Sequence, residues 1–117
     1  MRVAGKLRKR HEFQSVYTEG VRVVGRHVVI FVQSGSSAQA RLGVTATRRT
    51  GGAVVRNRAR RRVRELFRLH RDTLGATVVD VVVNVRATCW RAPWNELEKD
   101  YLECLARATD RLRRRES

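Results

Sequence analysis

Residues 56–64 contain six arginines, one asparagine and no acidic residue. Long blocks of like charge are usually disordered, because charges of one sign repel one another. Here the block is followed at once by residues 65–70, which are helix-forming and partly apolar. This continuation predicts that the charge belongs to a folded helix. A folded helix with so much positive charge needs a polyanion beside it.

Helical periodicity divides this segment into separate faces. We expect a helix over residues 53–71, after the flexible pair Gly51–Gly52. At about 100° per residue, the residues on the core-facing side are Val55, Ala59, Val63, Leu66, Phe67 and His70. A second face, here called the basic wall, consists of Asn57, Arg60, Arg61, Arg64, Arg68 and Arg71. The flank between the two faces carries Arg58, Arg62, Glu65 and Leu69.

The basic wall predicts contact with a nucleic acid. Solvated helix faces mix charges of both signs, because like charges four residues apart destabilise a helix. Asn57 is a poor helix former, but its amide both donates and accepts hydrogen bonds and suits ribose or base edges. An acidic membrane surface is disfavoured, because the apolar face fits a core and lacks Trp. Arg48 and Arg49, beside the free amides of the helix start, predict an additional phosphate site.

Length and charge agree with a nucleic-acid-binding domain. The chain has 117 residues and a net charge of +15, from 26 basic and 11 acidic residues. We expect one domain over residues 1–117, with flexible segments at 1–10 and 113–117. Only Lys6, Lys9 and Lys99 are lysines, and arginine matches phosphate groups with a planar fork of donors. An arginine-rich codon preference would explain that bias equally well, but not the net charge.

The two cysteines and the apolar segments predict a cytoplasmic protein. Cys89 and Cys104 form no Cys-x-x-Cys pair, and no secretory signal supports a disulfide, so free and inert thiols are expected. The longest apolar stretch, residues 78–85, is interrupted by Asp80 and Asn84 and is too short to span a bilayer.

The remaining patterns predict an α+β fold. The expected elements are a helix over 11–17 that ends at Gly20, strands over 21–25, 27–32 and 41–47, the basic helix, a strand over 77–86, and a helix over 95–114. In the last helix, the expected core positions are Leu97, Tyr101, Leu105, Ala108 and Leu112. Asn95 and Glu98 have the spacing of a capping box at its start.

No residue pattern predicts a catalytic site in the protein itself. A metal-dependent nuclease needs paired carboxylates, and acid–base catalysis needs suitably placed histidines. The acidic residues are scattered, and His11, His27 and His70 lie on different predicted elements. The residues alone therefore indicate a binding protein.

The arginine-rich segment also carries a family resemblance. The bacterial ribonuclease P protein subunit has the signature Arg-Asn-Arg-x-(Lys/Arg)-Arg-x-x-Arg, and residues 56–64, RNRARRRVR, match it fully. Residues 12–17, 41–44, 48–49, 51–55 and 81–86 are similar to the family as well. The resemblance implies a small α-β sandwich of order α-β-β-β-α-β-α, with a four-stranded sheet. It also implies a left-handed βαβ crossover through the basic helix, against the usual right-handed rule.

The function implied by this resemblance is that of a subunit of an endoribonuclease. In ribonuclease P an RNA subunit with Mg²⁺ is the catalyst, and it removes the 5′ leader from precursor tRNA to leave a 5′ phosphate. The protein is expected to act as a monomer in this ribonucleoprotein, with no catalytic residue and no metal site of its own. The residues implied to bind the RNA subunit are Arg48, Arg49, Arg56, Asn57, Arg58, Arg60, Arg61, Arg64 and Arg68. Those implied to line a cleft for the leader are Phe13, Tyr17, Val29 and Phe31.

The residues support the leader cleft but leave alternatives open. Val29 and Phe31 share one face of a strand, and Phe13 and Tyr17 are one helical turn apart. Aromatic side chains in a positive groove hold single strands by stacking, yet such pairs are more often simply core. A ribosomal or RNA-chaperone protein without a catalytic partner is the main alternative, and a DNA-recognition helix is a weaker one.

Overall fold

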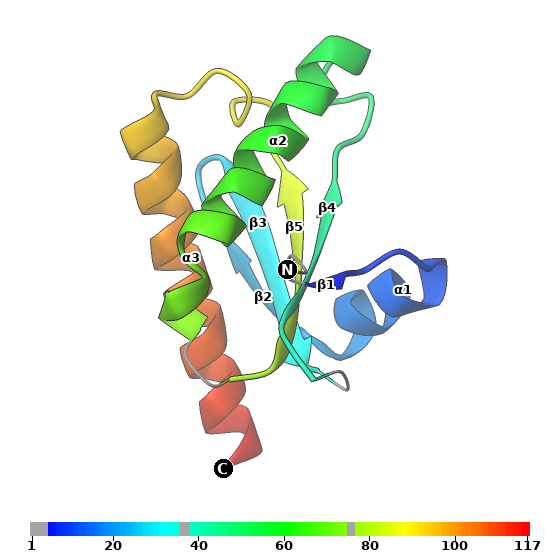
Figure 1. Cartoon of the computed structure of the whole chain (residues 1–117), viewed down its shortest axis with the longest axis vertical. Helices are drawn as coiled ribbons and strands as arrows, with labels where there is room; N and C mark the ends of the chain where they lie inside the picture. The colour runs from blue at the N-terminus through cyan, green and yellow to red at the C-terminus, as the bar shows by residue number, and fades with distance from the viewer. Residues whose placement is uncertain (1–4, 36–37, 75–76) are drawn as a thin grey trace.

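A mixed β-sheet forms the middle layer of the molecule (Figure 1). The computed structural model describes residues 5–35, 38–74 and 77–117. The strands are β1 (Gly5–Lys6), β2 (Val21–Val24), β3 (Val28–Ser34), β4 (Arg41–Thr45) and β5 (Val79–Val85), in the spatial order β1-β4-β5-β3-β2. The helices are α1 (Arg10–Glu19), α2 (Ala53–Leu69) and α3 (Trp94–Glu116), with a 3₁₀ turn, η1 (Arg71–Leu74), after α2.

The crossover from β4 to β5 is left-handed, as the resemblance implies. The two strands are adjacent and parallel, and α2 connects them. Seen from the side that α2 covers, with both strands running upward, β5 lies to the left of β4 (Figure 1). The other neighbours in the four-stranded part of the sheet, β2 with β3 and β3 with β5, are antiparallel.

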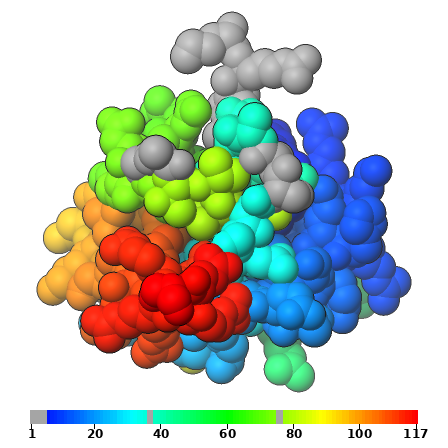
Figure 2. Space-filling view, turned by 90° about the horizontal axis from the view of Figure 1, so that it is seen from below, coloured from blue at the N-terminus to red at the C-terminus, as the bar shows by residue number. Residues whose placement is uncertain are grey.

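Helices cover both faces of the sheet. α2 and α3 pack on one face, and α1 packs on the other, so that α1 and α3 appear on opposite sides in Figure 2. β5 is therefore buried from both sides, which explains its nearly continuous run of valines. The larger core lies between the sheet, α2 and α3, and it contains all five core positions expected in the last helix.

The structure confirms the predicted order of elements and adds detail at their ends. The sheet has one more strand than expected, because the two residues of β1 are too few to give a periodic pattern; they pair with β4 at its edge. The basic helix ends at Leu69, and η1 takes up the following residues. Both terminal segments that were expected to be flexible contain regular structure. In the segment 1–10, residues 5–6 form β1 and residue 10 begins α1, and in the segment 113–117, α3 continues to Glu116.

The predicted capping box at the start of α3 is wrong. The helix begins at Trp94, and the carbonyl of Pro93 accepts hydrogen bonds from the backbone N–H groups of Glu96 and Leu97. The carboxylate of Glu98 instead lies 2.7 Å from Nε2 of His70, at the end of α2. A tertiary contact has thus replaced the local one that the spacing suggested.

Both cysteines are free and buried, as expected. Burial raises the pKa of Cys89 and that of Cys104 to about 11, which keeps both thiols protonated and unreactive at neutral pH. Within the described residues, no helix combines the length and the apolar character needed to cross a membrane.

Candidate nucleic-acid interface

The basic wall lies on the side of α2 that faces away from the core. Its exposed members are Asn57, Arg61, Arg64, Arg68 and Arg71, the last of which belongs to η1. Arg60 is half-buried and donates to Oδ1 of Asn57 at 3.0 Å and to the carbonyl of Ala46 at 3.5 Å. Among the described residues, the only wall arginine in an ion pair is Arg68, whose partner is Glu65. The wall is thus a positive surface with little internal neutralisation.

The opposite flank of α2 uses its arginines differently. Nε of Arg58 donates to the carbonyl of Trp90 at 2.8 Å. The guanidinium of Arg62 donates to the carbonyls of Cys89 and Ala92, at 2.6 and 2.5 Å, and lies 5.7 Å from the ring centroid of Trp94. Desolvation by burial lowers the pKa of Arg62. These two side chains therefore attach α2 to the segment that leads into α3.

The turn before α2 presents the other predicted arginines. Arg48 and Arg49 are exposed in this turn, and Arg56 is half-buried in the first turns of the helix. Gly51 has a φ of +145°, and a Cβ there would lie 2.8 Å from Val55 Cγ1, so glycine is required at this turn. The N-cap, Gly52, has no side chain to bond the first amides of α2.

On the other face of the sheet, α1 brings the predicted aromatic residues together. The aromatic face, as we call Phe13, Tyr17, Val29 and Phe31, consists of half-buried side chains. Val16 is fully buried between them and anchors the helix on the sheet. The rings of Tyr17 and Phe31 meet edge to face, with their centroids 4.8 Å apart. Phe13 lies over Gly43, where a Cβ would come within 2.6 Å of its ring.

The hydroxyl of Tyr17 extends this face with polar groups. It donates to Oδ1 of Asn84 at 2.7 Å and lies 3.1 Å from the hydroxyl of Thr45. Thr45, Asn84 and Val29 are register partners across β4, β5 and β3, so they form a row on the face that α1 covers. A row of half-buried polar and apolar side chains next to an aromatic pair is suited to nucleotide bases.

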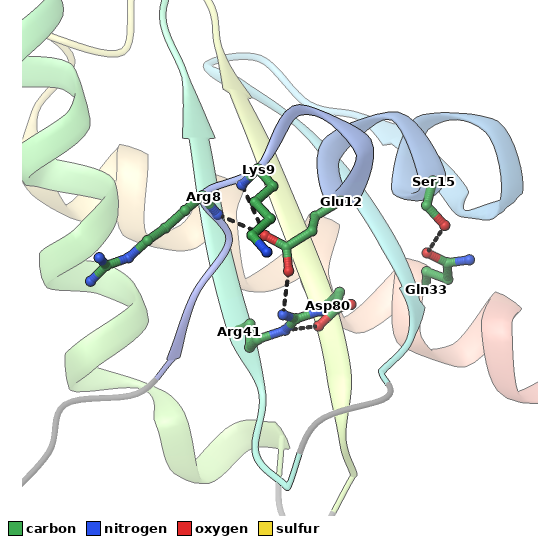
Figure 3. A network of polar contacts seen from close by, with 7 residues as sticks. All are labelled: Arg8, Lys9, Glu12, Ser15, Gln33, Arg41 and Asp80. Carbon is green, nitrogen blue, oxygen red and sulfur yellow. Dashed lines mark hydrogen bonds and ion pairs between the residues drawn. The ribbon is translucent and has the colours of Figure 1, made fainter.

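An ion-pair network holds the start of α1 against the sheet (Figure 3). Oε1 of Glu12 accepts the backbone N–H groups of Lys9 and Arg8, at 2.9 and 3.0 Å. Its Oε2 accepts a 2.6 Å hydrogen bond from Arg41 on β4. Arg41 also donates to both carboxylate oxygens of the buried Asp80 on β5, at 2.9 and 2.8 Å.

Through one guanidinium, that of Arg41 on β4, this network joins α1 to β5. The backbone N–H groups of Lys9 and Arg8 and the charge of Arg41 lower the pKa of Glu12 to about 2. Hydrogen bonds from Arg41 to Asp80, and then to Glu12, raise the pKa of Arg41. Glu12 and Arg41 therefore remain charged across the physiological range, and their ion pair fixes the position of α1 and its aromatic side chains.

The described residues offer no ready metal centre. They contain no group of three or more His, Cys, Asp or Glu side chains that could hold a metal ion. The carboxylates of Glu12 and Asp80 are already paired with the guanidinium of Arg41.

Comparison with known proteins decides the family. A model of the ribonuclease P family matches residues 1–109. The chain belongs to the ribonuclease P protein family. The ribonuclease P protein component of Kocuria rhizophila is 32% identical over 108 residues, which cover 91% of this chain and 93% of that protein. The protein component of Desulfosudis oleivorans is 36% identical over 98 residues, with 84% and 80% covered.

Solved ribonuclease P proteins share the fold. The Staphylococcus aureus protein superposes with a TM-score of 0.80 at 25% identity, covering 91% of this chain and 96% of that one. The Thermotoga maritima protein gives 0.77 at 27% identity, with 87% and 96% covered. The chain is therefore a ribonuclease P protein, an RNA-binding subunit of an endoribonuclease whose partner is the ribonuclease P RNA.

Several residues of these surfaces were not found from the sequence. Asp80 and Asn84 interrupt an apolar strand at even spacing, a signal that both point to one face. That signal could have predicted the polar row and the ion-pair network on the α1 side. Arg62 gave no comparable signal, because its carbonyl partners belong to an irregular segment.

Proposed function

We propose that this ribonuclease P protein binds the catalytic RNA through the basic wall and the 5′ leader of precursor tRNA through the aromatic face. It thereby assists the endonucleolytic removal of the leader, which leaves a mature 5′-phosphate tRNA. The protein acts as a monomer in the cytoplasmic ribonucleoprotein. Its residues bind and position RNA, and the chemistry belongs to the RNA subunit.

The unneutralised basic wall is the observation that carries this proposal. Among the described residues, Arg68 is the only wall arginine with an acidic partner, so the others are available to phosphate groups, which arginine binds bidentately. The surfaces proposed to contact the RNA subunit also include the turn before α2 and its first residues. The full set is Arg48, Arg49, Arg56, Asn57, Arg58, Arg60, Arg61, Arg64 and Arg68.

The aromatic face supports binding of a single strand. Its rings are half-buried, so they offer edges and faces to an unpaired base without leaving the core. Stacking on such side chains is tolerant of base identity. The hydroxyl of Tyr17 and the amide of Asn84 add hydrogen-bonding groups beside them.

We place the Mg²⁺ of the holoenzyme mainly on the RNA. When bound there, Mg²⁺ supplies an activated water and stabilises the charge that develops on the phosphate. The acidic side chains near the aromatic face are committed to Arg41, so the protein's own residues are a poor fit for the ion.

Reconstitution tests the proposal. The protein is mixed with a ribonuclease P RNA at low Mg²⁺, and 5′ maturation of precursor tRNA is measured. We expect stimulation by the wild type. Arg60→Ala with Arg64→Ala should weaken binding to the RNA subunit and flatten its log–log salt dependence by about 0.9 per lost phosphate contact.

The leader arm of the same experiment uses Phe31→Ala. We expect weaker capture of leader-bearing precursor and unchanged binding of mature tRNA, because mature tRNA has no leader to stack. Equal losses for both substrates would show that Phe31 serves the core alone. Absence of stimulation by the wild type would favour a ribosomal or chaperone role.

A further inference from the structure

A groove of about 500 Å³ lies between the second half of α2, the β1–β4 edge of the sheet and the start of α1. Its volume is in the range of small-ligand pockets, about 300–1,000 Å³. The apolar part is formed by Leu7, Phe13, Leu42, Val44 and Phe67, which come from four different elements or their flanks. Phe13 reaches this position because Gly43 leaves room for its ring.

The rim of the groove is strongly basic. It carries Lys6, Arg61, Arg64, Arg68 and Arg71, all of which are exposed, and a single acid, Glu65. Glu65 is paired with Arg68, so four cationic side chains surround an apolar floor without a partner among the described residues. An apolar floor suits the faces of a base, and the cationic rim suits the phosphates on either side of it.

We propose that this groove is a binding site for one unpaired nucleotide of the ribonuclease P RNA, with its base on the apolar floor and its phosphates on the arginine rim. The site deepens the proposed function, on which it rests, because four of its cations belong to the basic wall itself. The basic wall would then bind the phosphate backbone of the RNA. The groove would bind one extruded base and so fix the position of the protein along the RNA.

The charge distribution favours the RNA subunit over the leader. Arg61, Arg64 and Arg68 come from α2, whereas Phe13 is the only member of the aromatic face that lines the groove. A nucleotide carries both a negative charge for the rim and a flat apolar base for the floor.

Filling the groove without changing its charge tests the site. Val44 is half-buried and lines the floor, so Val44→Phe should occupy the space of the base. We expect this variant to bind the RNA subunit roughly tenfold more weakly. Chemical probing of unpaired bases should show one base that the wild type protects and the variant leaves reactive. Removing that base from the RNA should weaken the wild type but not Val44→Phe.

A second pair of variants avoids changes in the core. Lys6→Glu alters the exposed rim, and Lys99→Glu makes the same change of charge at an exposed position of α3 outside the groove. We expect the Lys6 variant to lose the base protection and the Lys99 variant to keep it. Identical footprints for these two variants would overturn the site.

The other outcomes are equally distinct. Wild-type affinity and protections for a folded Val44→Phe protein would show that no base enters the groove. A loss confined to leader-bearing precursor tRNA would assign the groove to the leader and overturn our choice of the RNA subunit. A wild-type protein that fails to bind the RNA subunit would overturn the proposed function together with this site.

Discussion

At the scale of single residues, charge compensation decides which groups serve the fold and which remain available to RNA. Arg41 is surrounded by Glu12 and Asp80 and is committed to holding α1 on the sheet. Arg61 and Arg64 have no acidic partner among the described residues and stay exposed. The same residue type therefore has two roles, and neighbouring carboxylates separate them.

The stabilisation by Glu12 should depend on pH. Its pKa is lowered from 4.5 to about 2 in the folded protein, so its contribution is complete above about pH 4.5. That contribution falls as the pH decreases toward 2 and is lost below it, because the folded and unfolded forms are then protonated alike. The free energy of unfolding of Glu12→Gln should lie below that of the wild type at neutral pH, with the difference vanishing in acid.

Denaturant unfolding across pH 2–7 measures this difference. Glu19→Gln, at an exposed position near the end of the same helix, is the matched control and should show a much smaller effect. A gap between Glu12→Gln and the wild type that stayed constant down to pH 2 would contradict the ionic role of Glu12.

At the scale of elements, α2 has arginines on two sides with opposite purposes. On one flank, Arg62 donates two hydrogen bonds to backbone carbonyls and lies over Trp94. On the wall, its neighbour Arg61 is exposed. A helix with 3.6 residues per turn places adjacent residues on different sides, so one arginine-rich segment can both attach to the fold and bind a partner.

Substitution of the two neighbours should separate stability from binding. Arg62→Ala should lower the free energy of unfolding by about 1–3 kcal/mol, because it leaves the partly buried carbonyls of Cys89 and Ala92 without this donor. Arg61→Ala should change stability by less than about 0.5 kcal/mol but weaken binding to the RNA subunit. Chemical denaturation and RNA titration of both variants check this; equal losses of stability would refute the assignment.

At the scale of the whole molecule, a net charge of +15 is confined within a radius of gyration of 13.3 Å. Such a charge opposes compaction by self-repulsion unless salt or a polyanion screens it. Folding of the protein and binding of RNA are therefore linked energetically, because RNA screens the positive charges that oppose compaction. Binding of RNA to the native state should stabilise the protein by mass action.

Salt alone should raise the thermal stability of the free protein. The screening length falls from about 30 Å at 0.01 M to about 8 Å at 0.15 M, which is shorter than the molecule's own radius of gyration. We expect Tm to increase over this range. The comparison variant carries Arg113→Glu and Arg115→Glu, at exposed positions of α3. Each substitution removes two units from the net charge of +15, so the salt-induced increase in Tm should be smaller in this variant than in the wild type. A Tm that does not respond to salt would show that self-repulsion is negligible here.

The sequence alone determined the elements other than β1 and η1, the two faces of α2 and the resemblance to the family. Periodicity is local, so Ala59, Val63 and Phe67 could be assigned to the core and Arg64 to the opposite face without knowledge of the fold. The arginine-rich signature gave the family in the same way, because it is contiguous in the chain. The left-handed crossover followed from the family resemblance, and not from any physical property of the residues.

Only the tertiary structure decided which partners the faces meet. Several of the contacts described above join residues that are 27 to 39 positions apart in the chain. They are the contacts of Arg62 with the segment before α3, of Arg41 with Glu12 and Asp80, and of Glu98 with His70. The groove beside the basic wall likewise needs α1, β4 and α2 together. Local patterns specify which side of an element is apolar or charged, whereas the neighbour of that side is set by the packing of the whole chain.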